Sequence, residues 1–210
     1  MHEIVGFLDM LGMVVFAISG ALAAAERRLD ILGFILFGTI TGIGGGTIRD
    51  LLLQADEVFW FSDTRYLWVC ILASVATWFV AHHLQSLRRV LLWADAIGLS
   101  VFSVIGAQKA LIWEAPVLVA VGMGMMTASF GSLIRDSLLG QPPVLLEADI
   151  YVTAAALGAL SYVGLTALAG LPGWDWVAGW AVPVSIGAAF LLRGSAILFN
   201  LQLPKYRPQH

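Results

Sequence analysis

Seven long apolar stretches, separated by short polar or turn-forming segments, constrain the fold of this chain more than any other feature. A helix that crosses a bilayer needs about 20 mostly apolar residues. Charged residues make up only 12% of the chain. That is about half the share in ordinary soluble domains, so a soluble fold would lack polar side chains for its surface. We therefore expect an all-α integral membrane protein whose seven transmembrane helices cover residues 4–25, 31–53, 66–84, 90–110, 116–139, 150–170 and 176–192.

The positions of lysine and arginine predict the orientation of these spans, because short cytoplasmic loops are enriched in both residues. Only Arg65 and Lys109 fall on the side of the N-terminus, whereas seven basic residues fall on the side of the C-terminus: Arg27, Arg28, Arg88, Arg89, Arg193, Lys205 and Arg207. We expect a multi-pass protein of the cell (inner) membrane, with its N-terminus outside and its C-terminus in the cytoplasm. The net charge of −3 gives no basic field for nucleic acid, so the expected surroundings are membrane lipid.

An internal repeat divides the chain. One block of residues recurs at an offset of 86, as Asp9, Gly12, Phe16 and Gly20 and again as Asp95, Gly98, Phe102 and Gly106. A second block, residues 45–50, recurs at the same offset as residues 131–136. Each copy holds three spans, an odd number, so the second copy must enter the membrane from the opposite side, as in many transporters. We expect two inverted three-helix repeats, at residues 1–89 and 90–171, followed by a seventh span and cytoplasmic tail at 172–210.

Glycines in the second span predict a local break in its helix. Gly44, Gly45 and Gly46 are consecutive, and glycine is a weak helix former. A break in lipid must expose its backbone to protein, water or an ion, which suggests a lined pathway with a transient K⁺ near these glycines. Close helix packing is the alternative explanation. The matching stretch of the fifth span keeps one glycine, and the hydroxyls and glycine expected beside the pathway are Thr41, Thr47, Ser129, Gly131 and Ser132.

Charged residues inside the spans form the second group of candidates, because they are costly in lipid and usually functional or paired. Arg49-Asp50 and Arg135-Asp136 are adjacent residues, which point about 100° apart on a helix, so we do not expect them to pair with each other. Depth in the membrane favours the pairs Asp9–Arg49 and Asp95–Arg135, one near each mouth. Alternatively, these pairs only hold the two copies together.

Two further glycine-phenylalanine sets lie on single helix faces, because their members are spaced by four residues. They are Gly12, Phe16 and Gly20 in the first span and Gly98, Phe102 and Gly106 in the fourth. A gate with phenylalanine as its plug is one interpretation. Packing of helices through small residues is the interpretation that we favour.

No enzyme is expected, because the sequence has no metal-ligand spacing, no nucleophile–histidine–acid set and no phosphate-binding loop. No cofactor and no dedicated metal site are expected either.

In residues 44–50 and 131–136, the sequence resembles the prokaryotic TRIC family, the homologues of trimeric intracellular cation channels. The duplicated unit of this family is also known as a glycine transporter domain (UPF0126). The resemblance implies seven spans, an external N-terminus, a homotrimer and one pore in each protomer. It also implies that kinked spans two and five line this pore, which conducts potassium and other monovalent cations such as sodium.

The residues themselves leave three functions open. A broken helix could serve a cation channel, a secondary transporter of glycine or a similar zwitterion as small-molecule substrate, or a membrane assembly protein that conducts nothing. Four acids, Asp9, Asp50, Asp95 and Asp136, face two arginines in the expected pathway. That net negative charge favours the cation channel.

Overall fold

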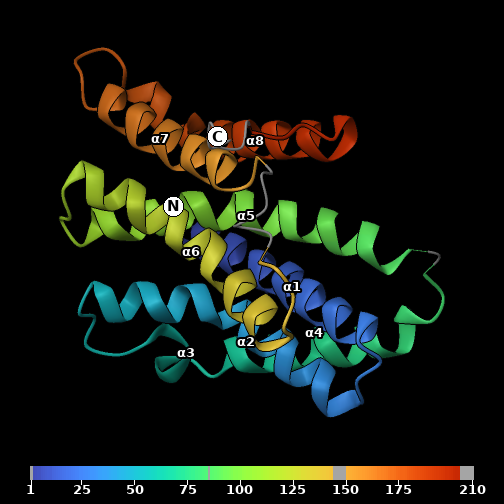
Figure 1. Cartoon of the computed structure of the whole chain (residues 1–210). Helices are drawn as coiled ribbons and strands as arrows, with labels where there is room; N and C mark the ends of the chain where they lie inside the picture. The colour runs from blue at the N-terminus through green and yellow to red at the C-terminus, as the bar shows by residue number, and fades with distance from the viewer. Residues whose placement is uncertain (1, 85, 144–149, 204–210) are drawn as a thin grey trace, which may run out of the picture.

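The computed structural model describes residues 2–84, 86–143 and 150–203, and this part of the chain folds into eight α-helices (Figure 1). Six helices are long and apolar enough to cross a membrane, and the 17-residue α4 is a shorter apolar helix. The chain is therefore a multi-pass membrane protein. The helices are α1 (His2–Glu26), α2 (Ile31–Leu52), α3 (Phe59–Ser62), α4 (Arg65–Ala81), α5 (Leu87–Ile112), α6 (Val117–Leu138), α7 (Val152–Ala169) and α8 (Ala178–Phe199), with a 3₁₀ turn, η2, at Asp175–Val177.

Each of the seven expected stretches corresponds to a helix, and side-chain caps explain two of the helix starts. The Asp30 carboxylate accepts a hydrogen bond from the Gly33 backbone N–H (2.8 Å) and caps α2. Ser86 caps α5 in the same way, by accepting from the N–H of Arg89 (3.4 Å). Such caps satisfy backbone donors that a helix start leaves free. The four-residue α3 was not expected, because so short a segment has no measurable periodicity.

Two of the basic residues counted for orientation pack within the protein and do not lie exposed at a span end. Lys109 belongs to the last turn of α5, and Arg193 lies in α8, which continues to Phe199. Arg193 is only 2% exposed. The Lys109 ammonium pairs with Asp9, so neither residue is counted toward orientation, and six basic residues remain against one.

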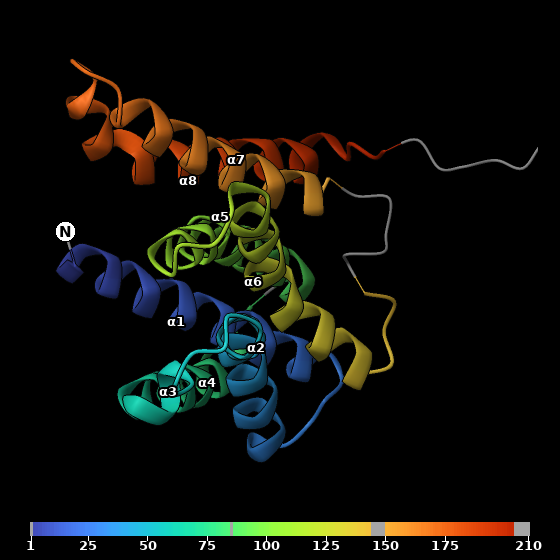
Figure 2. The same ribbon diagram turned by 90° about the vertical axis from the view of Figure 1, so that its left-hand side faces the viewer.

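The helices pack in three layers (Figure 2). α5 and α6 lie in the middle layer, α7 and α8 cover one side, and α1, α2 and α4 lie on the other. The contacts recur between the two expected copies: α1 packs on α2 and α4 as α5 packs on α6 and α7. α8 packs on α5 and α7.

The helix break predicted in the second span is wrong, because α2 is continuous through Gly44–Gly46. α6 is likewise continuous through Ser129–Ser132. Both helices bend instead (Figure 1). Hydroxyls contribute to such bending when they bond back to a carbonyl one turn earlier. Thr41 donates to the Phe37 carbonyl and Thr127 to the Met123 carbonyl, each at 2.6 Å. Because both helices stay continuous through the bend, they keep most of their backbone hydrogen bonds. Lipid could not replace bonds that were lost.

Glycines bring the backbones of α2 and α6 into direct contact at the centre of the protein. A side chain at Gly45 would overlap the Thr127 carbonyl, and one at Gly131 would overlap the Thr41 carbonyl. The two contacts are reciprocal. Gly45 of α2 meets Thr127, which precedes Gly131 in α6, and Gly131 meets Thr41, which precedes Gly45 in α2. α2 and α6 therefore cross in opposite directions, and their glycines serve close packing.

The other glycine-phenylalanine sets pack in the same reciprocal way between α1 and α5. The Phe16 and Phe102 rings stack with centroids 5.2 Å apart. Gly12 makes room for the Phe102 ring and Gly98 for the Phe16 ring. Both rings are buried. The structure places these rings in the packed core between the helices.

The α2–α6 contact predicts that Gly45→Ala will destabilise the protein. The added methyl group must push the Thr127 backbone away, and overpacking of this kind costs about 1–3 kcal/mol. The melting temperature of purified protein in detergent should fall. Gly122→Ala is the matched control on α6, because a Cβ there meets no atom within 4 Å, so stability should stay unchanged or rise slightly. Equal melting temperatures for the two variants would contradict the packing role.

Candidate functional site

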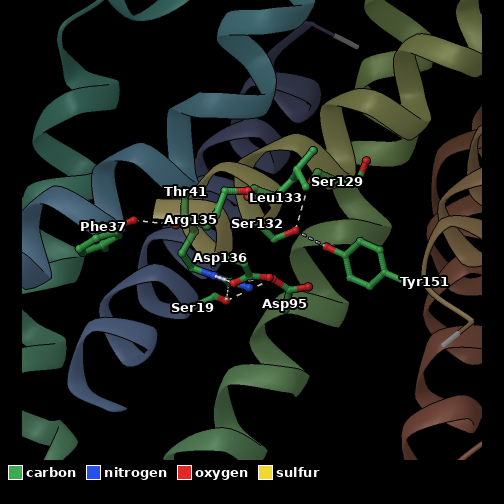
Figure 3. Close-up of polar contacts among 11 residues, drawn as sticks. Ser19, Phe37, Thr41, Asp95, Ser129, Ser132, Leu133, Arg135, Asp136 and Tyr151 are labelled. Carbon is green, nitrogen blue, oxygen red and sulfur yellow. Dashed lines mark hydrogen bonds and ion pairs between the residues drawn. The ribbon is translucent and has the colours of Figure 1, made fainter. Parts of the chain in front are cut away.

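One buried polar cluster surrounds Arg135 of α6, which is only 1% exposed (Figure 3). Its guanidinium lies against three partners from three helices. Nη1 donates to the Ser19 hydroxyl of α1 at 2.7 Å and lies 3.1 Å from Asp95 Oδ1 of α5. Nε donates to Asp136 Oδ1, one residue along α6, at 2.7 Å. Five guanidinium donors in a fixed fork suit this multiple bonding, so Arg135 ties α1, α5 and α6 together.

The cluster continues from Arg135 toward α7 and α8. The hydroxyls of Ser132 and Tyr151 lie 2.8 Å apart, and Tyr151 directly precedes α7 (Figure 3). The buried Arg193 guanidinium of α8 lies over the Tyr151 ring, 5.1 Å from its centroid, in a cation–π contact. We call these residues the Arg135 cluster: Ser19, Asp95, Ser132, Arg135, Asp136, Tyr151 and Arg193.

A second polar cluster surrounds Arg49 of α2. The Arg49 guanidinium pairs with Asp50 Oδ1, with Nε at 2.7 Å and Nη2 at 2.6 Å. The other Asp50 oxygen accepts the backbone N–H of Phe59 at the start of α3 (3.0 Å). Both the Arg49 guanidinium and the Lys109 ammonium lie over the Phe59 ring, at 5.6 and 5.4 Å from its centroid. The unexpected α3 thus covers this end of α2.

Asp9 completes this second cluster. One Asp9 oxygen lies 3.2 Å from the Lys109 ammonium of α5 and 3.4 Å from the Tyr66 hydroxyl of α4. We call these residues the Arg49 cluster: Asp9, Arg49, Asp50, Phe59, Tyr66 and Lys109.

The expected ion pairs are partly present. Asp95–Arg135 is confirmed, whereas Asp9 pairs with Lys109 and Arg49 pairs with Asp50. Position 23, which is 86 residues before Lys109, is an alanine, so the repeat gave no sign that α5 supplies this ammonium group. The expectation that adjacent residues do not pair was also wrong. Long arginine side chains fold back along their helices to reach Asp50 and Asp136.

The charge count in the clusters also changes. Four acids were set against two arginines, but Lys109 and Arg193 add two cations that the sequence did not place there. The two clusters together therefore hold four acids and four bases. The net negative charge that favoured a cation is absent, and any preference must come from other groups.

Hydroxyl groups along α2 and α6 point their protons at helix carbonyls. Thr47 donates to the Ile43 carbonyl at 2.8 Å and accepts the Trp60 indole N–H at 2.9 Å. Ser129 donates to the Met125 carbonyl, and Ser132 to the Ser129 carbonyl. Because each of these hydroxyl protons already takes part in a hydrogen bond, the oxygen lone pairs face a neighbouring group. A cation is bound by such lone pairs.

The crossing between these hydroxyls is tightly packed. A Cβ on Gly44 would lie 3.5 Å from the Gly131 Cα, and a Cβ on Gly46 would press on the Phe59 ring at 2.7 Å. Of the predicted pathway residues, the structure brings Thr41, Gly44, Gly45 and Gly131 together at the crossing of α2 and α6. Gly46 and Thr47 instead contact α3, and Ser132 contacts Tyr151. The Arg49 and Arg135 clusters lie at opposite ends of the crossing.

No metal centre accompanies these groups in residues 2–84, 86–143 and 150–203, where no three His, Cys, Asp or Glu side chains come close enough to hold an ion.

Comparison with known proteins places the chain in a family. A model described as a glycine transporter matches twice, at residues 6–82 and 92–167. The structure of a TRIC trimeric intracellular cation channel orthologue from Rhodobacter sphaeroides is 44% identical, with a TM-score of 0.88 over 94% of this chain and 99% of the other. The chain belongs to the TRIC family. A second prokaryotic TRIC channel structure is 30% identical, with a TM-score of 0.87 over 97% of this chain and 100% of the other.

Curated relatives of the TRIC chain carry a second family name. A UPF0126 membrane protein of Vibrio cholerae is 38% identical over 95% of this chain and 81% of its own length. The UPF0126 inner membrane protein YadS of Escherichia coli strain K12 is 36% identical over 97% of this chain and 96% of its own. These two relatives are described as membrane proteins, and the two solved structures as channels.

The Arg135 cluster predicts a large loss of stability in Arg135→Gln. Removal of one partner leaves buried carboxylates without their cation, which costs about 3–5 kcal/mol. Thermal unfolding in detergent measures the loss, and adding Asp95→Asn should restore part of it. Arg65→Gln is the control, because its ion pair with Asp63 is exposed and worth about 1 kcal/mol or less. Strictly additive losses in the double variant would mean that the Asp95–Arg135 contact contributes nothing.

Proposed function

We propose that this protein is a passive channel for monovalent cations, permeable to K⁺ and Na⁺, that works as a homotrimer with one pathway in each protomer. The observation that carries the proposal is the likeness to a TRIC cation channel orthologue, at 44% identity and a TM-score of 0.88 over nearly the whole chain. A likeness of this extent covers both α2 and α6 and the two clusters beside them. No cofactor takes part in the proposed activity.

The proposed topology has seven spans, with α4 as the third. Its 17 residues extend about 25 Å, at the lower end of what a spanning helix needs. The reciprocal contacts of Gly45 with Thr127 and of Gly131 with Thr41 support an inverted relation between residues 1–89 and 90–171. Residues 172–210 then hold the seventh span and the tail. The excess of basic residues on the side of the C-terminus supports an external N-terminus and a cytoplasmic C-terminus.

The proposed pathway follows the crossing of α2 and α6 between the Arg49 and Arg135 clusters. In the present conformation the crossing is closed, because backbone meets backbone at Gly45 and Gly131. Conduction therefore requires the two bent helices to separate. Separation would expose the carbonyls of Thr41 and Thr127 to a passing K⁺, close to Gly44–Gly46, and carbonyl oxygens are the groups that replace water around this ion.

Ion pairing inside the clusters fits a pathway that binds its ion only briefly. Each of the four aspartates lies beside a basic group, so no free carboxylate holds a cation tightly. Conduction needs binding weak enough for the ion to leave. At one end the Lys109 ammonium occupies the position beside Asp9 where a permeating cation would be attracted.

Transport of glycine is the second candidate function, because the model that matches both halves of the chain is described as a glycine transporter. Inverted repeats with a closed crossing are also compatible with alternating access. A non-conducting assembly protein is the third candidate. The three functions differ in what crosses the membrane, so they can be separated by measurement.

Purified protein in planar bilayers should give unitary K⁺ currents, and sealed liposomes that contain it should show no saturable uptake of labelled glycine. Saturable glycine uptake without unitary currents would overturn the channel and favour the transporter. If neither signal appeared, the assembly role would stand.

Lys109→Met serves as the variant that connects current to the pathway. It removes the ammonium beside Asp9, so the local potential becomes more negative and the unitary K⁺ conductance should rise about twofold or more. Arg65→Gln, an exposed basic residue at the start of α4, is the control and should leave conductance unchanged. Unitary conductance is the proper readout because it does not depend on how much protein folds.

A further inference from the structure

A groove of about 460 Å³ lies apart from the α2–α6 crossing, between the α1–α2 turn, α2, α4 and the start of α5. Its walls are apolar and aromatic, with Leu29, Phe34, Trp78 and Leu87 among the lining residues. The Trp78 and Phe34 rings meet edge to face at 4.8 Å. Two residues with basic side chains, Arg28 and His82, also line the groove. The combination is an apolar trough with polar, basic groups at its end.

Arg28 occupies a backbone position that does not require a basic side chain. Its φ is +55°, the left-handed conformation that usually closes a helix with glycine or asparagine. Position 114, which is 86 residues later, has the same φ of +55° but carries a glutamate. In the same alignment His82 corresponds to Leu168. The fold therefore accepts an acid and an apolar residue at these two places, and the basic pair is particular to this groove.

Other basic side chains surround the mouth of the groove. Around it, the α1–α2 turn and the segment between α4 and α5 carry two acids, Glu26 and Asp30, and the Asp30 carboxylate caps α2. Against these two acids stand the exposed residues Arg27, Arg28, His82, His83, Arg88 and Arg89. Even with neutral histidines, four arginines outnumber the acids, so this end of the protein attracts anions.

A second groove, on another face of α4, provides a contrast. It has a volume of about 360 Å³ and is lined by apolar residues such as Val14, Ile18 and Val80, together with Thr77. None of its lining residues is charged. Any acyl chain suits that groove, whereas the first groove adds a site for an anionic group.

We propose that the first groove binds one anionic glycerophospholipid, of the phosphatidylglycerol class. One acyl chain lies against Trp78 and Phe34, and the phosphate lies between Arg28 and His82. Basic clusters where a span meets the cytoplasm attract anionic lipid headgroups, and buried acyl methylenes add apolar contact. This proposal goes beyond the cation channel and does not depend on it.

Quenching of Trp78 fluorescence by brominated acyl chains tests the proposal directly. The full-length protein is placed in nanodiscs of phosphatidylcholine with increasing brominated phosphatidylglycerol, or with brominated phosphatidylcholine instead. The Trp78→Phe variant identifies the part of the signal that comes from Trp78. Brominated phosphatidylglycerol should quench Trp78 at lower mole fractions. Arg28→Gln should weaken this preference about fivefold, and Arg28→Lys should keep most of it.

Arg27→Gln is the matched control, because Arg27 is the neighbouring exposed arginine and does not line the groove. Its preference for phosphatidylglycerol should stay close to that of the unchanged protein. Equal losses in Arg27→Gln and Arg28→Gln would assign the effect to general surface charge and overturn the site. Equal quenching by the two lipids would overturn the anionic preference. Absence of Trp78 quenching by either lipid, as expected if another copy of the chain covers the groove, would overturn it as well.

Discussion

The backbone contact between α2 and α6 is the constraint on which the rest of the structure depends. Gly45 and Gly131 let the two helices touch carbonyl to glycine, an approach that any larger residue would prevent. The same contact closes the crossing and sets the two bent helices in opposite directions. It also fixes the Arg49 and Arg135 clusters at its two ends. In the proposed channel, the pathway along this crossing opens only when the two helices separate at this contact.

Because lipid solvates charge poorly, charged groups buried in the spans must be paired. An unpaired charge in a span is costly, so Arg135 and Arg49 each fold back on a neighbouring aspartate while other helices supply further partners. The two ends differ, however. The Arg135 guanidinium bonds Asp95 directly, whereas Lys109 takes the corresponding place beside Asp9. The two copies of the repeat therefore share a backbone plan but carry different electrostatics.

Sequence reasoning predicted the helices well because seven apolar stretches and one repeat offset leave little freedom. It also predicted the Asp95–Arg135 pair, since both residues lie at similar depth in their spans. It missed the roles of Lys109 and Tyr151, which follow from tertiary packing and have no counterpart in the repeat pattern. It interpreted Gly44–Gly46 as a break because local propensity argues against a helix there, whereas tertiary contact with α6 outweighs that propensity.

A reversible lock across the α2–α6 crossing tests the central claim most directly. An ideal Cβ at Gly44 lies 3.3 Å from Ile134 Cδ1, so the two positions are neighbours across the crossing. Cysteines are placed there in a Cys70→Ala background, and loss of free thiols on oxidation verifies that the disulfide has formed before currents are recorded. Oxidation should abolish the unitary K⁺ current, and reduction should restore it, because the helices must separate for an ion to pass. Currents that persist unchanged in the fully oxidised protein would show that the pathway lies elsewhere.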